Sequence, residues 1–169
     1  MLKTIGAIMV IGASGGFGVS KAVQFYRRLH QLREFYRALE LLKCELNYTL
    51  LPLPRICRMT AERAKGAVSA YLLKYAQKLE SGLPRTKAAA QSMEEVRGLS
   101  LPSDAQMALL ELFEALGRYD LEGENRLLQM TAHRLNASIE RYESEKKPLA
   151  KGYAALGFCT GLALVILII

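Results

Sequence analysis

A glycine-rich stretch near the N-terminus is the feature of the sequence that most closely mimics a cofactor site. Residues Ile11 to Gly18 read IGASGGFG, and glycines spaced in this way bring a backbone close to the pyrophosphate of a dinucleotide. Tyr142 and Lys146 also have the spacing of a catalytic tyrosine–lysine pair. A dinucleotide site, however, needs strands around the turn and an acid about 20 positions further on. Residues 33–37 continue a helical pattern instead, and we therefore expect no dinucleotide cofactor.

The remaining candidates for catalysis or metal binding are scattered. His30 and His133 lie far apart in the sequence, and neither has a His, Cys or Asp partner at the spacing of metal ligands. Two acidic pairs are typical of solvated helix faces, and three separated cysteines without a CxxC motif are typical of free thiols. These residues are Glu94-Glu95, Glu122-x-Glu124, Cys44, Cys57 and Cys159. We expect no catalytic residues, no metal and no cofactor, so the protein is predicted not to be an enzyme.

The distribution of charge explains an unusual composition. The mean hydropathy is +0.09 although 23% of the residues are charged, because residues 4–20 and 152–169 contain no charged side chain. The region between them carries all 16 acidic residues of the chain. This pattern excludes a plain soluble domain, a disordered chain and a multidomain enzyme.

Both uncharged ends have the character of membrane segments. Residues 149–169 are predicted to form a transmembrane helix, because their uncharged run would rise about 27 Å against a hydrocarbon thickness of about 30 Å. Residues 1–23 are predicted to form a second one. Glycines dilute its apolar character, so a cleaved signal peptide and a soluble segment remain as alternatives. The basic cluster that follows favours a retained span.

Basic residues next to the two spans predict the orientation of the chain. Lys3 alone lies on the outer side, whereas the inner sides are rich in basic residues. The central region, residues 24–148, is therefore expected in the cytoplasm. The net charge of +7 then indicates a membrane and not nucleic acid. The residues expected to set this topology are Lys21, Arg27, Arg28, Lys146, Lys147 and Lys151.

Each predicted span also contains two glycines four positions apart. Gly12 and Gly16 form one pair, and Gly157 and Gly161 form the other. This spacing permits close contact between helices, either within the chain or between copies in a homo-oligomer. Glycine is also common in membrane helices generally, which is the simpler interpretation.

The central region has helical periodicity throughout. A first helix is predicted to continue to about Asn47, and a last long helix begins after Asp120 as its N-cap. Met107 and Leu121 are expected on buried faces. The fold class is all-α: an antiparallel bundle of about six helices, of which the first and last are long and continue into the N- and C-terminal transmembrane helices. The short helices between them are predicted at Arg55–Lys65, Val68–Glu80, Thr86–Arg97 (with Thr86 as cap) and Ser103–Leu116.

Several short motifs follow one another along the whole chain. They are Gln31-Leu32-Arg33, Glu80-Ser81-Gly82-Leu83, Leu116-Gly117-Arg118-Tyr119-Asp120 and Tyr153-x-x-Leu156-Gly157. In this order they resemble a known family, stage III sporulation protein AB of endospore-forming bacteria. Tyr119 and Pro148 depart from the expected pattern, and either affects only a local turn.

This resemblance implies a function that no spacing in the chain reveals. The family's cytoplasmic domain is similar to that of the inner-membrane platform proteins of type II secretion and type IV pilus systems. The resemblance thus implies a protein of the mother-cell membrane around the forespore. It would assemble a secretion-like channel with a secretion-type ATPase (stage III sporulation protein AA) and other proteins of the same operon. The alternatives are a membrane-tethered helical adaptor of another envelope complex, and a secreted helical protein with a C-terminal anchor.

Overall fold

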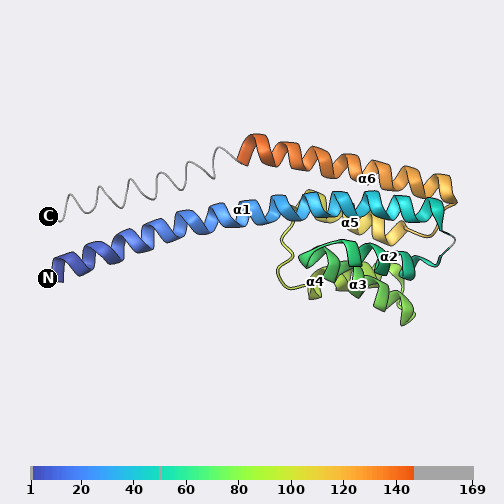
Figure 1. The fold of residues 1–169 in the computed structure, drawn as a ribbon, viewed down its shortest axis with the longest axis horizontal. Helices are drawn as coiled ribbons and strands as arrows, with labels where there is room; N and C mark the ends of the chain where they lie inside the picture. Colours follow the sequence, from blue (N-terminus) through green and yellow to red (C-terminus); the bar gives the residue numbers. More distant parts are fainter. Residues whose placement is uncertain (1, 50, 147–169) are drawn as a thin grey trace. The chain divides into compact units, whose positions relative to one another are not determined.

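The described part of the chain is helical from end to end. The computed structural model describes the backbone of residues 2–49 and 51–146, and the side chains of residues 20, 23–49 and 51–144. These residues contain six α-helices and a π-helical turn, and no strand, which confirms the all-α prediction (Figure 1). The helices are α1 (Leu2–Tyr48), α2 (Leu53–Arg63), α3 (Gly66–Glu80), α4 (Arg85–Glu95), α5 (Ser103–Ala115) and α6 (Leu121–Arg141), followed by the π-helical turn Tyr142–Lys146.

Glycine and proline set most of the helix ends. Gly82, Gly98 and Gly117 follow α3, α4 and α5 with φ angles of +82°, +83° and +83°. Other residues reach this left-handed region only at a cost of roughly 1–2 kcal/mol, so glycine ends these helices. Prolines occupy the N-cap positions of α2, α4 and α5. The prediction that Thr86 caps its helix is wrong, because α4 begins one residue earlier and Pro84 precedes it.

The chain divides into two units, residues 30–139 and residues 1–29 with 140–169. In the described part of the second unit, the rings of Phe25 and Tyr142 stack with centroids 5.5 Å apart. Arg28 Nη1 donates to the Tyr142 hydroxyl at 3.2 Å. These contacts join the N-terminal part of α1 to the π-helical turn that follows α6.

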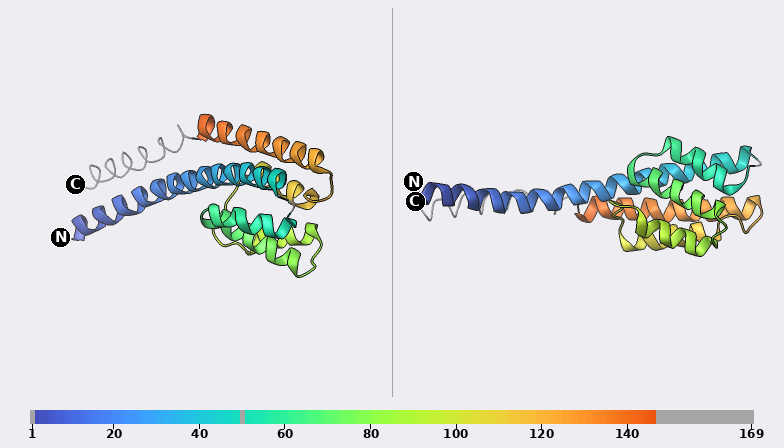
Figure 2. Two further views of the ribbon diagram at one scale, coloured as in Figure 1. Left: turned by 45° about the vertical axis from the view of Figure 1, so that its right-hand side comes forward. Right: turned by 90° about the horizontal axis from the view of Figure 1, so that it is seen from below.

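Within residues 30–139, α6 runs antiparallel to the second half of α1 (Figures 1 and 2). Asn47 and Asn125 exchange side-chain hydrogen bonds between these two helices at 2.8 and 2.9 Å. The shorter helices pack in sequence, α2 on α3, α3 on α4 and α4 on α5. This arrangement confirms the prediction of short helices beside two long ones.

An aromatic cluster lies in the core where α1, α3 and α5 meet. The rings of Phe35, Tyr71, Tyr75 and Phe113 are fully buried. Phe113 makes edge contacts with both tyrosine rings at centroid distances of 5.0 Å, and the two tyrosines stack at 6.2 Å. Aromatic pairs at these separations are worth about 0.5–1.5 kcal/mol beyond the burial of their surface.

Two residues predicted to be buried are exposed. Met107 is 60% exposed, because it lies two positions from buried Ala105 and Leu109 and therefore on the opposite side of α5. Leu121 is 51% exposed and is the first residue of α6, before the part of the helix that packs on the core. Leu128, further along the same face, is buried as predicted.

The predicted transmembrane helices are not seen in the described residues. Within residues 2–49 and 51–146, no helix combines the length and the apolar character needed to cross a membrane. Residues 1–23 belong to α1 from Leu2 onward. The second predicted span, residues 149–169, lies outside the described residues.

Candidate functional site

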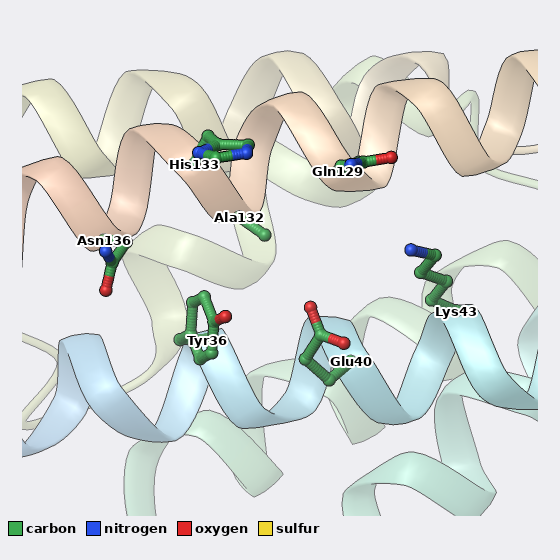
Figure 3. A pocket seen from close by; sticks show the side chains of 7 residues that line it. All are labelled: Tyr36, Glu40, Lys43, Gln129, Ala132, His133 and Asn136. Atoms are coloured by element: carbon green, nitrogen blue, oxygen red, sulfur yellow. The ribbon is translucent and has the colours of Figure 1, made fainter.

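A polar groove runs between α1 and α6 (Figure 3). It has a volume of about 200 Å³, and α1 and α6 both contribute polar side chains to it. Because the helices are antiparallel, the N-terminal positions of one wall face the C-terminal positions of the other. The lining residues are Tyr36, Glu40 and Lys43 of α1 and Gln129, Ala132, His133 and Asn136 of α6.

The groove is lined by one acidic, one basic and one imidazole side chain among neutral residues. The side chains of Glu40, Lys43 and His133 make no hydrogen bond or ion pair with other described residues. Across the described part of the chain, no three His, Cys, Asp or Glu side chains are grouped so that they could hold a metal ion.

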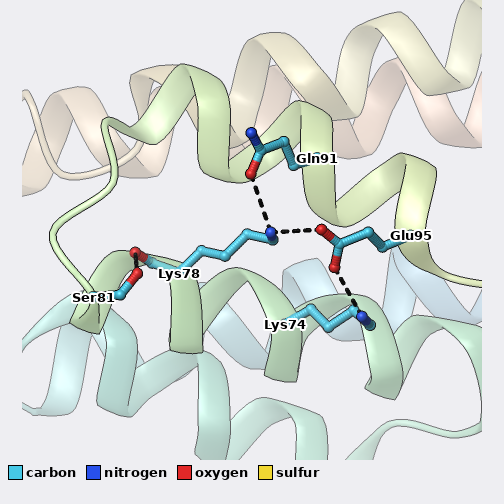
Figure 4. Close-up of polar contacts among 5 residues, drawn as sticks. All are labelled: Lys74, Lys78, Ser81, Gln91 and Glu95. Carbon is cyan, nitrogen blue, oxygen red and sulfur yellow. Dashed lines mark hydrogen bonds and ion pairs between the residues drawn. The ribbon is translucent and has the colours of Figure 1, made fainter.

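An ion-pair network joins α3 to α4 on the surface (Figure 4). Lys78 Nζ donates to Glu95 Oε1 at 2.7 Å and to Gln91 Oε1 at 3.1 Å, and Lys74 Nζ donates to Glu95 Oε2 at 2.9 Å. The hydrogen bonds from Lys78 and Lys74 lower the pKa of the Glu95 carboxyl to about 2. A carboxylate held ionised in this way fastens two helices together, and it is a poor general acid or base near neutral pH.

The turn between α5 and α6 is fixed by two acidic side chains. Glu124 Oε1 accepts hydrogen bonds from the backbone N–H groups of Gly117 at 2.7 Å and Tyr119 at 3.0 Å. Asp120 Oδ1 accepts the Gly123 N–H at 3.1 Å, which confirms Asp120 as the cap of α6. The interpretation of Glu124 as part of a solvated face is wrong, since only 4% of it is exposed. Glu124 lies one helical turn before Leu128, which is buried, and this spacing indicates that Glu124 lies on the buried face of α6.

A second clamp of this kind joins α1 to the segment after α4. Gln31 is buried, and its side-chain amide binds two backbone groups of that segment. Nε2 donates to the Gly98 carbonyl at 2.7 Å, and Oε1 accepts the Ser100 N–H at 2.8 Å. Gln31 therefore positions the loop that follows α4. In the sequence, the glycine at the end of α4 was the one residue that indicated this loop.

The residues predicted to set topology and span packing are only partly described. Gly12, Gly16 and Lys21 lie within α1, so the IGASGGFG stretch is helical and does not form a nucleotide-binding turn after a strand. Arg27 is exposed, and Arg28 is half-buried beside Tyr142. Lys146 ends the π-helical turn. Four predicted residues lie outside the described part: Lys147, Lys151, Gly157 and Gly161.

The cysteines differ sharply in accessibility. Cys44 on α1 is exposed, whereas Cys57 on α2 is fully buried, and both thiols are free. Burial raises the pKa of the Cys57 thiol to about 12. A thiol with so little thiolate is unsuited to nucleophilic catalysis. Cys159 lies outside the described residues.

Comparison with known proteins gives the same result by sequence and by structure. The chain is 28% identical over 170 residues to stage III sporulation protein AB of Bacillus subtilis (strain 168), and the match covers 99% of each chain. A solved structure of stage III sporulation protein AB covers 72% of this chain and 98% of its own, with a TM-score of 0.65 and 25% identity. Residues 3–169 match the family described as stage III sporulation protein AB. The chain therefore belongs to the stage III sporulation protein AB family.

Proposed function

We propose that this protein is a membrane-attached assembly component, or platform, of a secretion-like channel required for endospore formation. Its helical domain would couple a cytoplasmic ATPase to the membrane components of that channel, without catalysing a reaction itself. Family membership over nearly the whole chain carries the proposal, because it implies a role in sporulation.

Membrane attachment is the first part of the proposal. It is supported by the two charge-free stretches at residues 4–20 and 152–169 and by the basic residues beside them. In this arrangement the domain lies in the cytoplasm of the mother cell, and the spans lie in the membrane that surrounds the forespore. The glycine pairs at 12 and 16 and at 157 and 161 would allow those spans to pack.

The absence of an enzymatic role is the second part. It is supported by the hydrogen bonds that carboxylates of the described residues make, because these bonds hold helices or turns in place. Glu95 fastens α3 to α4, and Glu124 fixes the α5–α6 turn. Such a rigid helical domain suits transmission of force or movement between an ATPase and membrane partners.

Cysteine labelling tests the orientation. Cys44 is the useful probe because it is exposed, whereas Cys57 is buried and serves as an internal control. With Cys159 replaced by serine, we expect a membrane-impermeant maleimide to label Cys44 only after the mother cell is permeabilised. Labelling of Cys44 in intact cells would contradict the cytoplasmic placement.

Deletion and co-purification test the role itself. We expect a strain without the protein to grow normally but to stop spore formation after engulfment, and the tagged protein to bring the sporulation ATPase with it from sporulating cells. A defect in vegetative growth would favour the alternative, a helical adaptor of another envelope complex. If sporulation fails but no ATPase is found in the purified complex, the result would support the role in sporulation and contradict the coupling to an ATPase.

A further inference from the structure

We infer that the surface around the α5–α6 turn is a docking site for an acidic, amphipathic segment of a protein partner. This turn surface consists of Arg55, Arg85, Lys87, Arg118, Tyr119 and Met130. The inference concerns the chemistry of a partner and does not rest on the proposed channel function or on membrane attachment.

The first step is that three parts of the sequence converge at Gly117. A Cβ atom placed on Gly117 would lie 3.2 Å from Arg85 Nη2 and 3.4 Å from Leu53 Cδ2. Leu53 is the first residue of α2 and Arg85 the first residue of α4. The N-terminal turns of these two helices therefore meet the α5–α6 turn. Arg55 and Lys87 lie in the same first turns, two residues after Leu53 and Arg85.

The second step is that the cations of this region lack partners while its acids have them. The side chains of Arg55, Arg85, Lys87 and Arg118 make no hydrogen bond or ion pair with described residues. Each acid of the turn has a local partner. Asp120 caps α6, Glu122 pairs with Arg126 at 3.2 Å, and Glu124 binds two backbone N–H groups.

The helix ends add to the positive potential at this place. Neither α2 nor α4 has an acidic residue in its first turn, and neither has a side-chain hydrogen bond to its N-cap region. Helix N-termini carry partial positive charge and favour acids nearby, so basic residues in both first turns are unfavourable for folding alone. Carboxylates supplied by a partner would relieve this unfavourable arrangement.

The third step is a mainly apolar pocket that begins at Tyr119, the residue after Arg118, and continues along α6. Gly123 allows Tyr119 to lie against the first turn of α6, because a Cβ on Gly123 would come within 2.8 Å of Tyr119 Cβ. Although it is held closely in this way, Tyr119 is 59% exposed, and Met130 is 54% exposed. Together with Leu127 they line a pocket of about 290 Å³. A preorganised exposed tyrosine next to arginine is typical of residues that dominate binding energy at protein interfaces.

These features favour a protein segment over a bilayer or a nucleic acid. The apolar surface is confined to one pocket lined by Tyr119, Leu127 and Met130, whereas a segment that binds lipid inserts the apolar face of a whole helix. The turn surface presents one aromatic ring and not the row of rings on which successive bases stack. An amphipathic helix, with one apolar side chain in the pocket and acidic residues toward the arginines, matches both the pocket and the charge.

The test is a binding measurement with designed peptides on the immobilised full chain. The probe is a fluorescent 16-residue helical peptide, in which leucines form one face and glutamates the other. Its counterpart replaces every glutamate with lysine. We expect the acidic peptide to bind at least about tenfold more tightly than the basic one, and binding to weaken as NaCl is raised from 50 to 200 mM.

Matched variants locate the binding on the turn surface. We expect the double variant R55E/R118E to weaken binding of the acidic peptide by about tenfold or more, and Met130→Ser by about fivefold. The controls are Lys65→Glu, a charge reversal beyond the other end of α2, and Met107→Ser, an equally exposed methionine on α5. Both controls should change binding by less than about twofold, with circular dichroism confirming that every variant is folded.

Several outcomes would overturn the inference. Equal binding of the acidic and basic peptides, no binding of either, or equal effects of the control variants would each remove it. Anionic vesicles of phosphatidylglycerol or a 20-nucleotide DNA strand, tested on the same chain, would also overturn it if they bound through Arg55 and Arg118 while the peptide did not.

Discussion

Two neighbouring tyrosines in the core offer a sharp test of how this domain is stabilised. Tyr71 and Tyr75 lie one turn apart on α3, are fully buried and stack on each other. The Tyr75 hydroxyl donates to the Phe113 carbonyl at 2.5 Å. The Tyr71 hydroxyl has no hydrogen-bond partner among the described residues. The same substitution by phenylalanine should therefore change stability in opposite directions at these two positions.

The magnitudes follow from the cost of unpaired buried polar groups. Such a group costs about 1–3 kcal/mol, so Tyr71→Phe should raise the free energy of unfolding by about 1 kcal/mol while keeping the ring contacts. Tyr75→Phe loses the hydrogen bond and leaves the Phe113 carbonyl unpaired, because the Gly117 N–H donates to Glu124. We expect a loss of about 1–2 kcal/mol, which separates the two variants by about 2–3 kcal/mol.

The dependence of stability on pH gives an independent check on the same residues. Burial raises the pKa of both phenols above the ordinary value of 10.0. The native state then keeps protons that the unfolded state loses, so stability falls as the pH rises above about 10. Each phenylalanine variant should flatten this alkaline decline, because it removes one of the two groups.

The assay is urea unfolding of the full chain followed by circular dichroism at 222 nm. Tyr119→Phe is the control, because its ring is largely exposed and its hydroxyl contributes little to folding. A decrease of more than about 0.5 kcal/mol for Tyr71→Phe would refute the reasoning, because it would mean that this hydroxyl has a favourable partner such as a buried water.

Three further variants test other contacts in the domain. Glu124→Ala should cost about 2–4 kcal/mol by urea unfolding, and its combination with Tyr75→Phe should cost about 1 kcal/mol less than the sum. With the third cysteine replaced by serine, Ellman's reagent should modify Cys44 in the native chain and Cys57 only on unfolding; rapid modification of both would contradict the burial. Glu95→Gln should remove stability that wild type has above about pH 4.5 and loses toward pH 2, as thermal melts across that range would show.

Local signals explain how much of this fold was predictable from the sequence. Glycines after α3, α4 and α5 and prolines before α2, α4 and α5 act on the backbone within one or two residues, so the helix number and most boundaries follow from them. The IGASGGFG stretch lies within α1, and the described residues contain no strand beside which such a glycine-rich turn forms.

The contacts that hold the candidate sites were not predictable, because their partners are distant in the sequence. Gln31 binds a loop 67 residues away, and Tyr75 binds a carbonyl 38 residues away. Glu124 looked like a surface acid beside Glu122, although one points into the turn and the other into solvent. Met107 was misplaced because both faces of α5 carry apolar residues, and only packing decides which face is buried.

The end of α5 shows how the core and the turn surface depend on each other. In a continuing helix the Phe113 carbonyl would accept the N–H of Gly117, four residues later. Gly117 instead adopts φ +83° and donates to Glu124 on α6, so the carbonyl is left for the Tyr75 hydroxyl on α3. Removing Glu124 and the Tyr75 hydroxyl together leaves a donor and an acceptor that can restore the helical bond with each other. This is why their losses should not add.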